Sequence, residues 1–172
     1  MARILDKLRG GDRRSIGRAN EVVSDVISNP SLFESVFGGM QHPDPLVRMR
    51  SADVVEKVSG KQPELLQPFK HKLINEIADI EQNEVRWHVA LMFSYLSLGM
   101  KEKQLVVRKL NEWLDHGTSN IVRVNALQSL VDIGKSDKKL WPAINDKLNK
   151  TLSSDSPALR KRAGILLKSA KK

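Results

Sequence analysis

The sequence predicts an all-α solenoid of about four helix pairs, because one motif recurs at a nearly constant interval. In this motif an apolar residue precedes an arginine, and a small or β-branched residue follows three positions later. The motif recurs in steps of 38, 37 and 37 residues, and between its copies apolar residues recur four apart, as on one helical face. The four arginines are Arg48, Arg86, Arg123 and Arg160.

The N-terminal section predicts three helices that do not follow this repeat. Apolar spacing predicts the first over residues 2–9. Asp12 is a suitable cap for a second helix, with an apolar stripe over 16–27. Residues 31–34 have a capping-box pattern that starts a third helix, which Gly38-Gly39 is expected to end.

The rest of the chain divides into repeats that begin with recognisable helix starts. Asp44-Pro45 and Ser156-Pro157 each combine an N-cap residue with a proline at the first helical position. Paired helices are expected at 45–59 and 63–80, at 83–98 and 101–116, and at 120–133 and 137–152. We therefore predict a single repeat domain over 1–172, with an atypical repeat or cap at 1–42, repeats at 43–81, 82–118 and 119–155, and a capping helix at 156–172.

Apolar residues of the second helices align between repeats, and so predict the core. A two-helix unit cannot bury both of its apolar stripes alone, so neighbouring units must cover them. The aligned sets are Phe69, Val106 and Ile144; Leu73, Leu110 and Leu148; and Ile77, Leu114 and Leu152.

The repeat resembles the HEAT family, whose units are antiparallel helix pairs. The resemblance rests on Val85-Arg86 with Val89, Val122-Arg123 with Ala126, and Leu159-Arg160 with Ala163. It covers roughly residues 43–170 and implies a right-handed α-α superhelix whose second helices line a concave surface. It specifies no function, because one fold serves many functions.

The chain carries a net charge of +9, which is concentrated in its last part. Residues 101–172 contain sixteen Lys and Arg against seven Asp and Glu, whereas the preceding sections are nearly neutral. This asymmetry is typical of a surface that meets an anionic partner.

The absence of cysteine excludes disulfides. The longest apolar run, Val89–Phe93, is too short for a membrane span, so we expect a cytoplasmic protein.

The arginine column has two interpretations. It could be a row of anion contacts, or a ladder in which each arginine binds a helix-terminal carbonyl or a nearby Asp or Asn. A planar guanidinium with five donors suits such a joint, and the HEAT resemblance also favours the ladder.

A second set of cations is the candidate surface for an anionic partner. Aligned lysines of the second helices, with neighbouring cations, could follow a phosphate backbone or an acidic peptide. Solvated lysines that cover apolar edges are the alternative, and the nearby Glu76, Glu112 and Asp146 would interrupt a continuous basic groove. The candidate residues are Lys72, Arg108, Lys109, Lys147 and Lys150.

No catalytic or cofactor motif stands out. The four histidines show no metal-ligand spacing, and neither an H-E-x-x-H motif nor a glycine-rich phosphate loop is present. We expect no enzyme activity and no cofactor.

The predicted function is a scaffold or adaptor that binds a protein on its concave face. The alternative is a nucleic-acid-binding module that uses the basic C-terminal half. Homodimerisation through the solenoid ends is a further option.

We expect Arg123→Ala to lower the melting temperature, because the recurrence of this arginine indicates a structural joint. Thermal unfolding followed by circular dichroism tests this, and an unchanged melting temperature would contradict the ladder.

We also expect no turnover of alkylated DNA.

Overall fold

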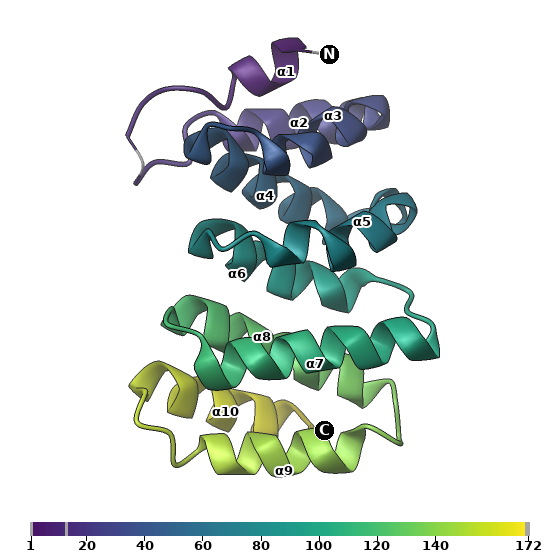
Figure 1. The fold of residues 1–172 in the computed structure, drawn as a ribbon, viewed down its shortest axis with the longest axis vertical. Coiled ribbons are helices and arrows are strands. Elements are labelled where there is room, and N and C mark those ends of the chain that lie inside the picture. Colours follow the sequence, from purple (N-terminus) through teal and green to yellow (C-terminus); the bar gives the residue numbers. More distant parts are fainter. Residues whose placement is uncertain (1, 13, 171–172) are drawn as a thin grey trace. The chain divides into compact units, whose positions relative to one another are not determined.

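The computed structural model describes residues 2–12 and 14–170. These residues form ten α-helices and six 3-10 helices and contain no strand (Figure 1). The predicted all-α fold built from packed helices in series is confirmed. The chain divides into two compact units, unit 1 (Met1–Ser97) and unit 2 (Leu98–Lys172). Their boundary lies inside the predicted repeat 82–118, and the single repeat domain stays a prediction.

In unit 1, α4 is the central helix. It packs against α2, α3 and α6, and its N-terminus matches the prediction, because the Asp44 side chain accepts a hydrogen bond from the Leu46 N–H and Pro45 follows. Its inward face is almost entirely buried, including Val47, Val54 and Val58. The α-helices of this unit are α1 (Ala2–Asp6), α2 (Ala19–Ser28), α3 (Phe33–Gly38), α4 (Pro45–Ser59), α5 (Lys70–Asn75) and α6 (Asn83–Met92).

Unit 2 contains four longer helices: α7 (Met100–His116), α8 (Asn120–Lys135), α9 (Trp141–Thr151) and α10 (Pro157–Ala170). Helix α8 packs against α7, α9 and α10, and so forms the centre of the unit (Figure 1). Helix α8 ends at Lys135, two residues beyond the predicted end at residue 133, so Gly134 lies in its last turn. A Cβ atom at this position would lie 2.7 Å from Ile144 Cδ1, so the glycine permits close contact between α8 and α9.

The predicted apolar columns form most of the core, with two corrections. Leu73, Leu110 and Leu148 are fully buried. Phe69 is only half-buried, although its ring stacks on Phe37. Leu152 is 42% exposed, because α9 ends at Thr151 and Leu152 already belongs to the following turn.

The predicted second helix at 63–80 is wrong as one continuous element. It is divided into 3-10 turns at Pro63–Leu65, Gln67–Phe69 and Ile77–Asp79 around the short α5. Pro68 explains the first break, because proline donates no backbone hydrogen bond and clashes with the preceding turn.

Other predicted boundaries also move, and one is confirmed. Helix α6 ends at Met92, where the 3-10 turn Phe93–Tyr95 takes over, and the chain from Leu96 is extended. Helix α3 ends at Gly38 with Gly39 as its C-cap, as predicted, and a 3-10 turn over Gly39–Gln41 follows. The predicted capping box at Ser31 does not form: no side chain caps α3, and the Ser31 hydroxyl donates to Asn29 Oδ1. Helix α9 begins at Trp141, four residues later than predicted.

The loop before α2 is organised by a buried arginine. Arg50 of α4 is 1% exposed and donates to four backbone carbonyls: those of Leu8, Gly10, Asp12 and Ser15, at 2.6–3.1 Å. The loop can surround the guanidinium because Gly10, Gly11 and Gly17 have positive φ angles. The predicted start of a helix at Asp12 is therefore wrong: α2 begins at Ala19, and Ile16 is exposed.

We expect Arg50→Met to destabilise unit 1 by about 3 kcal/mol, because four carbonyls lose a charged donor. Arg50→Lys should have an intermediate effect, since a single ammonium group has three donors and no fork geometry. Urea unfolding followed by circular dichroism measures both. Arg14→Met, an exposed change in the same loop, is the control. A wild-type unfolding midpoint for Arg50→Met would contradict the role assigned to this guanidinium.

Candidate binding surface

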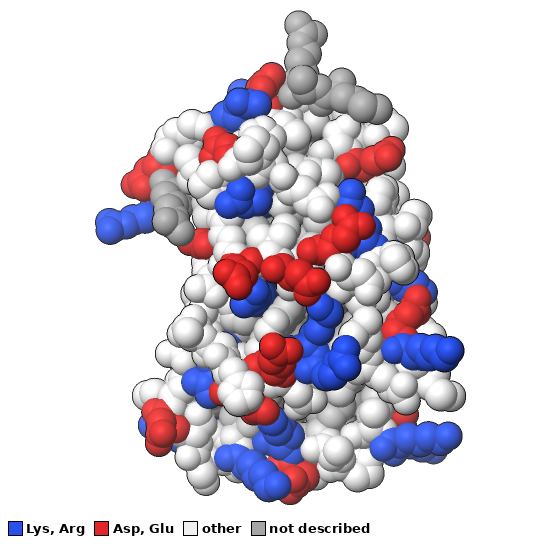
Figure 2. Space-filling view, viewed as in Figure 1, with Lys and Arg blue, Asp and Glu red and all other residues white. Residues whose placement is uncertain are grey.

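The five predicted cationic residues belong to two different units. Lys72 lies on α5 of unit 1, whereas Arg108, Lys109, Lys147 and Lys150 lie on α7 and α9 of unit 2. In unit 2, Lys and Arg side chains alternate with Asp and Glu side chains on the face that α7 and α9 present (Figure 2). The structure therefore places four of the five candidates in one compact unit, on a surface of mixed charge.

Two of these residues line a single pocket together with Arg123 of the arginine column. The pocket has a volume of about 270 Å³ and lies where the C-terminal ends of α7 and α9 meet the starts of α8 and α10. We call it the Arg123 pocket. Its lining residues are Leu114, Asp115, Arg123, Lys147, Lys150, Thr151, Ser154 and Leu159. Three cations and one carboxylate make this pocket suitable for an anion.

The lysines of the Arg123 pocket are held by carboxylates of unit 2. Lys147 Nζ lies 2.6 Å from Asp115 Oδ2, which joins α9 to α7. Lys150 Nζ lies 2.7 Å from Asp146 Oδ2, one helical turn earlier, and this hydrogen bond raises the pKa of Lys150. Both members of the second pair are well exposed, so water screens their attraction. An incoming anion would compete with Asp115 for Lys147. At Lys150 it would compete with Asp146, whose attraction for the lysine is weaker because both side chains are more exposed.

The arginine column makes the kind of contact that the ladder interpretation expects. Arg123 Nε donates to the Leu114 carbonyl in the last turn of α7 at 2.9 Å. Arg48 donates to the carbonyls of His42 and Pro43 and to Gln82 Oε1. Arg160 donates to the Ser154 and Asp155 carbonyls, and Arg86 is half-buried on α6. Whether these contacts stabilise the fold stays a prediction, tested by Arg123→Ala.

The pocket contains residues that sequence analysis did not select. Thr151 and Ser154 come from the end of α9 and the following turn. No motif or spacing in the sequence connects them to Lys147, because the connection is made by the packing of helix ends.

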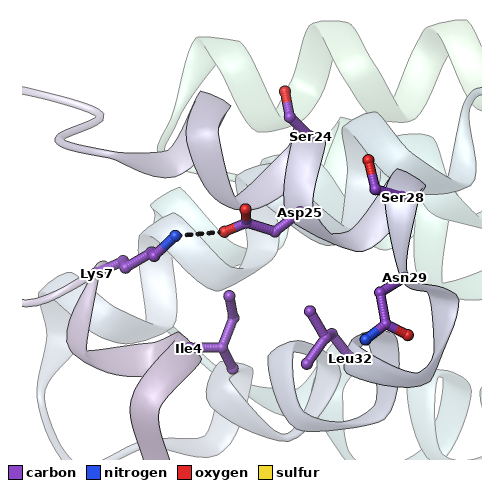
Figure 3. Close-up of a pocket in the computed structure, with 7 residues that line it drawn as sticks. All are labelled: Ile4, Lys7, Ser24, Asp25, Ser28, Asn29 and Leu32. Atoms are coloured by element: carbon purple, nitrogen blue, oxygen red, sulfur yellow. Dashed lines mark hydrogen bonds and ion pairs between the residues drawn. The ribbon is translucent and has the colours of Figure 1, made fainter.

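Unit 1 contains a larger hollow near the N-terminus, with a volume of about 510 Å³. Ile4 and Leu32 form its apolar wall, and Ser24, Ser28 and Asn29 are its uncharged polar residues (Figure 3). Its two charged lining groups, Lys7 and Asp25, bind each other at 2.7 Å. Because these charges are already matched, the hollow offers no net charge to a ligand.

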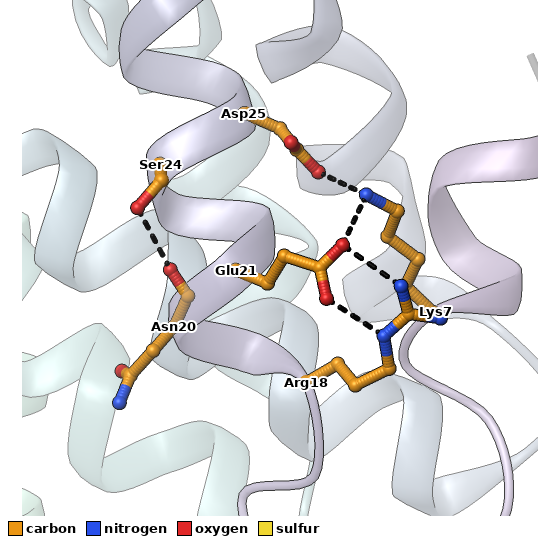
Figure 4. Close-up of polar contacts among 6 residues, drawn as sticks. All are labelled: Lys7, Arg18, Asn20, Glu21, Ser24 and Asp25. Atoms are coloured by element: carbon orange, nitrogen blue, oxygen red, sulfur yellow. Dashed lines mark hydrogen bonds and ion pairs between the residues drawn. The ribbon is translucent and has the colours of Figure 1, made fainter.

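A network of ion pairs fixes α1 to α2 beside this hollow (Figure 4). Lys7 Nζ lies 2.6 Å from Glu21 and 2.7 Å from Asp25, and Arg18 donates two hydrogen bonds to the Glu21 carboxylate. The hydrogen bonds from Arg18, and then those from Lys7, lower the pKa of Glu21 from 4.5 to about 2. This network binds the first helix to the body of unit 1.

A second polar cluster in unit 1 lies between α4 and α6. Tyr95 donates to Glu56 at 2.7 Å, and the His88 ring lies 3.7 Å from Glu56 and 3.9 Å from Asp53. Burial opposes ionisation of Glu56, but the nearby His88 ring and the hydrogen bond from Tyr95 outweigh it, and the pKa of Glu56 is lowered. These groups bind one another, and we interpret the cluster as a structural link between the two helices.

No helix in the described part of the chain combines the length and the apolar character needed to cross a membrane. Within residues 2–12 and 14–170, no group of three or more His, Asp and Glu side chains is placed to hold a metal ion.

Comparison with protein-family models gives no match, and neither does comparison with curated proteins. The X-ray structure of YibA from Escherichia coli has a similar fold, with a TM-score of 0.58 and 19% sequence identity. The similarity covers 92% of this chain and 53% of YibA, so this chain spans about half of that protein. At this identity the likeness concerns the fold alone.

We expect Glu21→Gln to lower the melting temperature near pH 7 and to have a much smaller effect near pH 2. The pKa of Glu21 is depressed in the folded state, so its contribution is complete above pH 4.5 and is lost as the pH falls towards about 2. Melting curves of both proteins across this range measure the difference. Glu34→Gln, at an exposed glutamate of α3, is the matched control. A difference that persists unchanged at pH 2 would show that the ion pairs are not its cause.

Proposed function

We propose that this chain is a non-catalytic helical-repeat adaptor of the HEAT type, and that its Arg123 pocket binds an acidic side chain of a protein partner. One observation carries the proposal: Arg123, Lys147 and Lys150 come from two helices and line one hollow. Leu114 and Leu159 add an apolar wall. A carboxylate with a neighbouring apolar group matches both properties of this lining.

The charge pairs favour a discrete acidic group over a continuous phosphate backbone. Duplex DNA presents a phosphate about every 1.7 Å along its axis, and binding it requires many cations that can be neutralised together. In unit 2, Asp115 and Asp146 already lie against Lys147 and Lys150. A single partner carboxylate has to replace only Asp115, and the displaced side chain is 44% exposed, so it can turn to water.

The aromatic residues of unit 2 also favour a protein partner over single-stranded nucleic acid. Proteins that bind single strands without sequence preference stack bases on exposed aromatic rings. Trp113 is only 7% exposed, because it belongs to the buried face of α7, and Trp141 is half-buried. The excess of positive charge in the last part of the chain keeps nucleic acid as the second candidate.

Fluorescence anisotropy with a labelled Gly-Ser peptide that carries a central Glu-Leu-Glu tests the proposal. We expect salt-sensitive binding that Lys147→Glu weakens about tenfold, corresponding to a charged contact worth about 1.4 kcal/mol. Asp115→Asn should strengthen binding, because it removes the internal competitor for Lys147.

The matched control is Asp132→Asn, which removes an equal charge from an exposed residue of α8. If it strengthens binding as much as Asp115→Asn, the effect comes from net charge and the pocket is not the site. If duplex DNA binds while the acidic peptide does not at low salt, the nucleic-acid function replaces the adaptor.

A further inference from the structure

A second hollow in unit 2 lies at the opposite ends of α7 and α9 from the Arg123 pocket. It has a volume of about 520 Å³ and lies between the first turns of α7 and the link between α8 and α9. In Figure 1 this is the end of unit 2 where the chain enters α7 and leaves α8. We call it the Lys103 pocket. Its principal residues are Met100, Lys103, Gln104, Lys138, Lys139 and Leu140.

The Lys103 pocket has an exposed apolar wall. Met100, the first residue of α7, is 76% exposed, which makes it the most exposed large apolar side chain among the described residues. Leu140 is half-buried in the same lining. A flexible methionine beside a hollow can adapt to apolar groups of different shape. An apolar side chain of a partner would remove both residues from water.

The lining of the Lys103 pocket is positively charged, and one carboxylate within it, that of Asp137, holds the Lys103 side chain in position. Asp137 lies 2.8 Å from Lys103 and also accepts hydrogen bonds from the backbone N–H groups of Lys139 and Leu140. The hydrogen bond from Lys103, followed by that from the Lys139 N–H, lowers the pKa of Asp137. Asp137 is therefore committed to this turn, while the side chains of Lys138 and Lys139 are exposed.

One stripe of α7 connects the two pockets. Gln104 lines the Lys103 pocket, Asp115 lines the Arg123 pocket, and the exposed Arg108 and Glu112 lie between them at helical spacing. At 1.5 Å per residue, the distance along the axis from Gln104 to Asp115 is about 16 Å. An extended peptide covers this distance in about five residues.

We infer that one extended segment of a partner protein occupies both pockets, with an acidic and apolar pair of residues at each end and about five residues between the pairs. This rests on the proposed function and specifies its ligand. Arg108 lies on the path between the pockets, so a central acidic residue would add to binding. Two linked contacts raise affinity because the second forms at a high effective concentration.

A peptide fits these observations better than a lipid surface. The two pockets lie at opposite ends of parallel helices and are separated by a stripe that contains the carboxylate of Glu112. An anionic membrane would bring many like charges against Glu112, whereas a peptide can place an uncharged residue there.

The test compares three labelled peptides on the intact chain by anisotropy. The first carries one Glu-Leu-Glu element, the second carries two such elements about five residues apart, and the third has the same composition with the two elements adjacent. We expect the second to bind at least about tenfold more tightly than the other two. Met100→Ser and Lys139→Glu should each remove most of this gain.

Lys61→Glu, an equal charge change at an exposed residue of unit 1, controls for long-range attraction and should leave the gain intact. If the first peptide binds and the spaced peptide gains nothing, the two-pocket inference fails while the adaptor function stands. If no peptide binds, the proposed function itself fails. If vesicles of anionic lipid bind more tightly than the spaced peptide and Met100→Ser abolishes that binding, a lipid surface replaces the peptide as the occupant.

Discussion

The need to cover apolar faces on both sides of a helix underlies this structure. Val122, Leu127 and Leu130 lie on different sides of α8 and are all buried, so α8 requires α7, α9 and α10 around it. Such a helix is stable only inside a unit, because most helical stability comes from packing and not from local propensity. Gly134 allows the Ile144 side chain of α9 to pack closely against α8, and a Cβ atom there would require that side chain to shift.

Packing of this kind leaves the helix ends at the surface, where the candidate site is formed. The Arg123 pocket and the Lys103 pocket both lie where helix ends and their links meet, and neither depends on a special loop motif. Rigid helices fix the positions of Lys147 and Lys103, while long side chains and nearby carboxylates keep the charges adjustable. This combination suits the proposed binding of an acidic segment, because the internal carboxylates hold the cations in place.

The two units use polar groups differently. Unit 1 uses them to hold itself together: Arg50 gathers the loop before α2, and Lys7, which follows α1, binds Glu21 and Asp25 of α2. Unit 2 places most of its cations at the surface, on α7, α9, α10 and the link between α8 and α9. In unit 2, Arg123 and Arg160 also bind backbone carbonyls, whereas many of the lysines lie at the surface.

The sequence by itself determined the all-α class, most helix starts and much of the core, because these depend on local caps and on apolar spacing within one helix. Asp44 at the start of α4 and the buried set of Leu73, Leu110 and Leu148 are examples. Only the tertiary structure decided the environment of Arg50, whose four acceptors lie 35 to 42 residues away. It also decided that Lys147 meets Asp115, that Lys72 lies in the other unit, and that Met100 stands beside a hollow. Contacts between distant segments depend on how helices pack side by side, and the periodicity of one helix contains no information about its neighbour's polar groups.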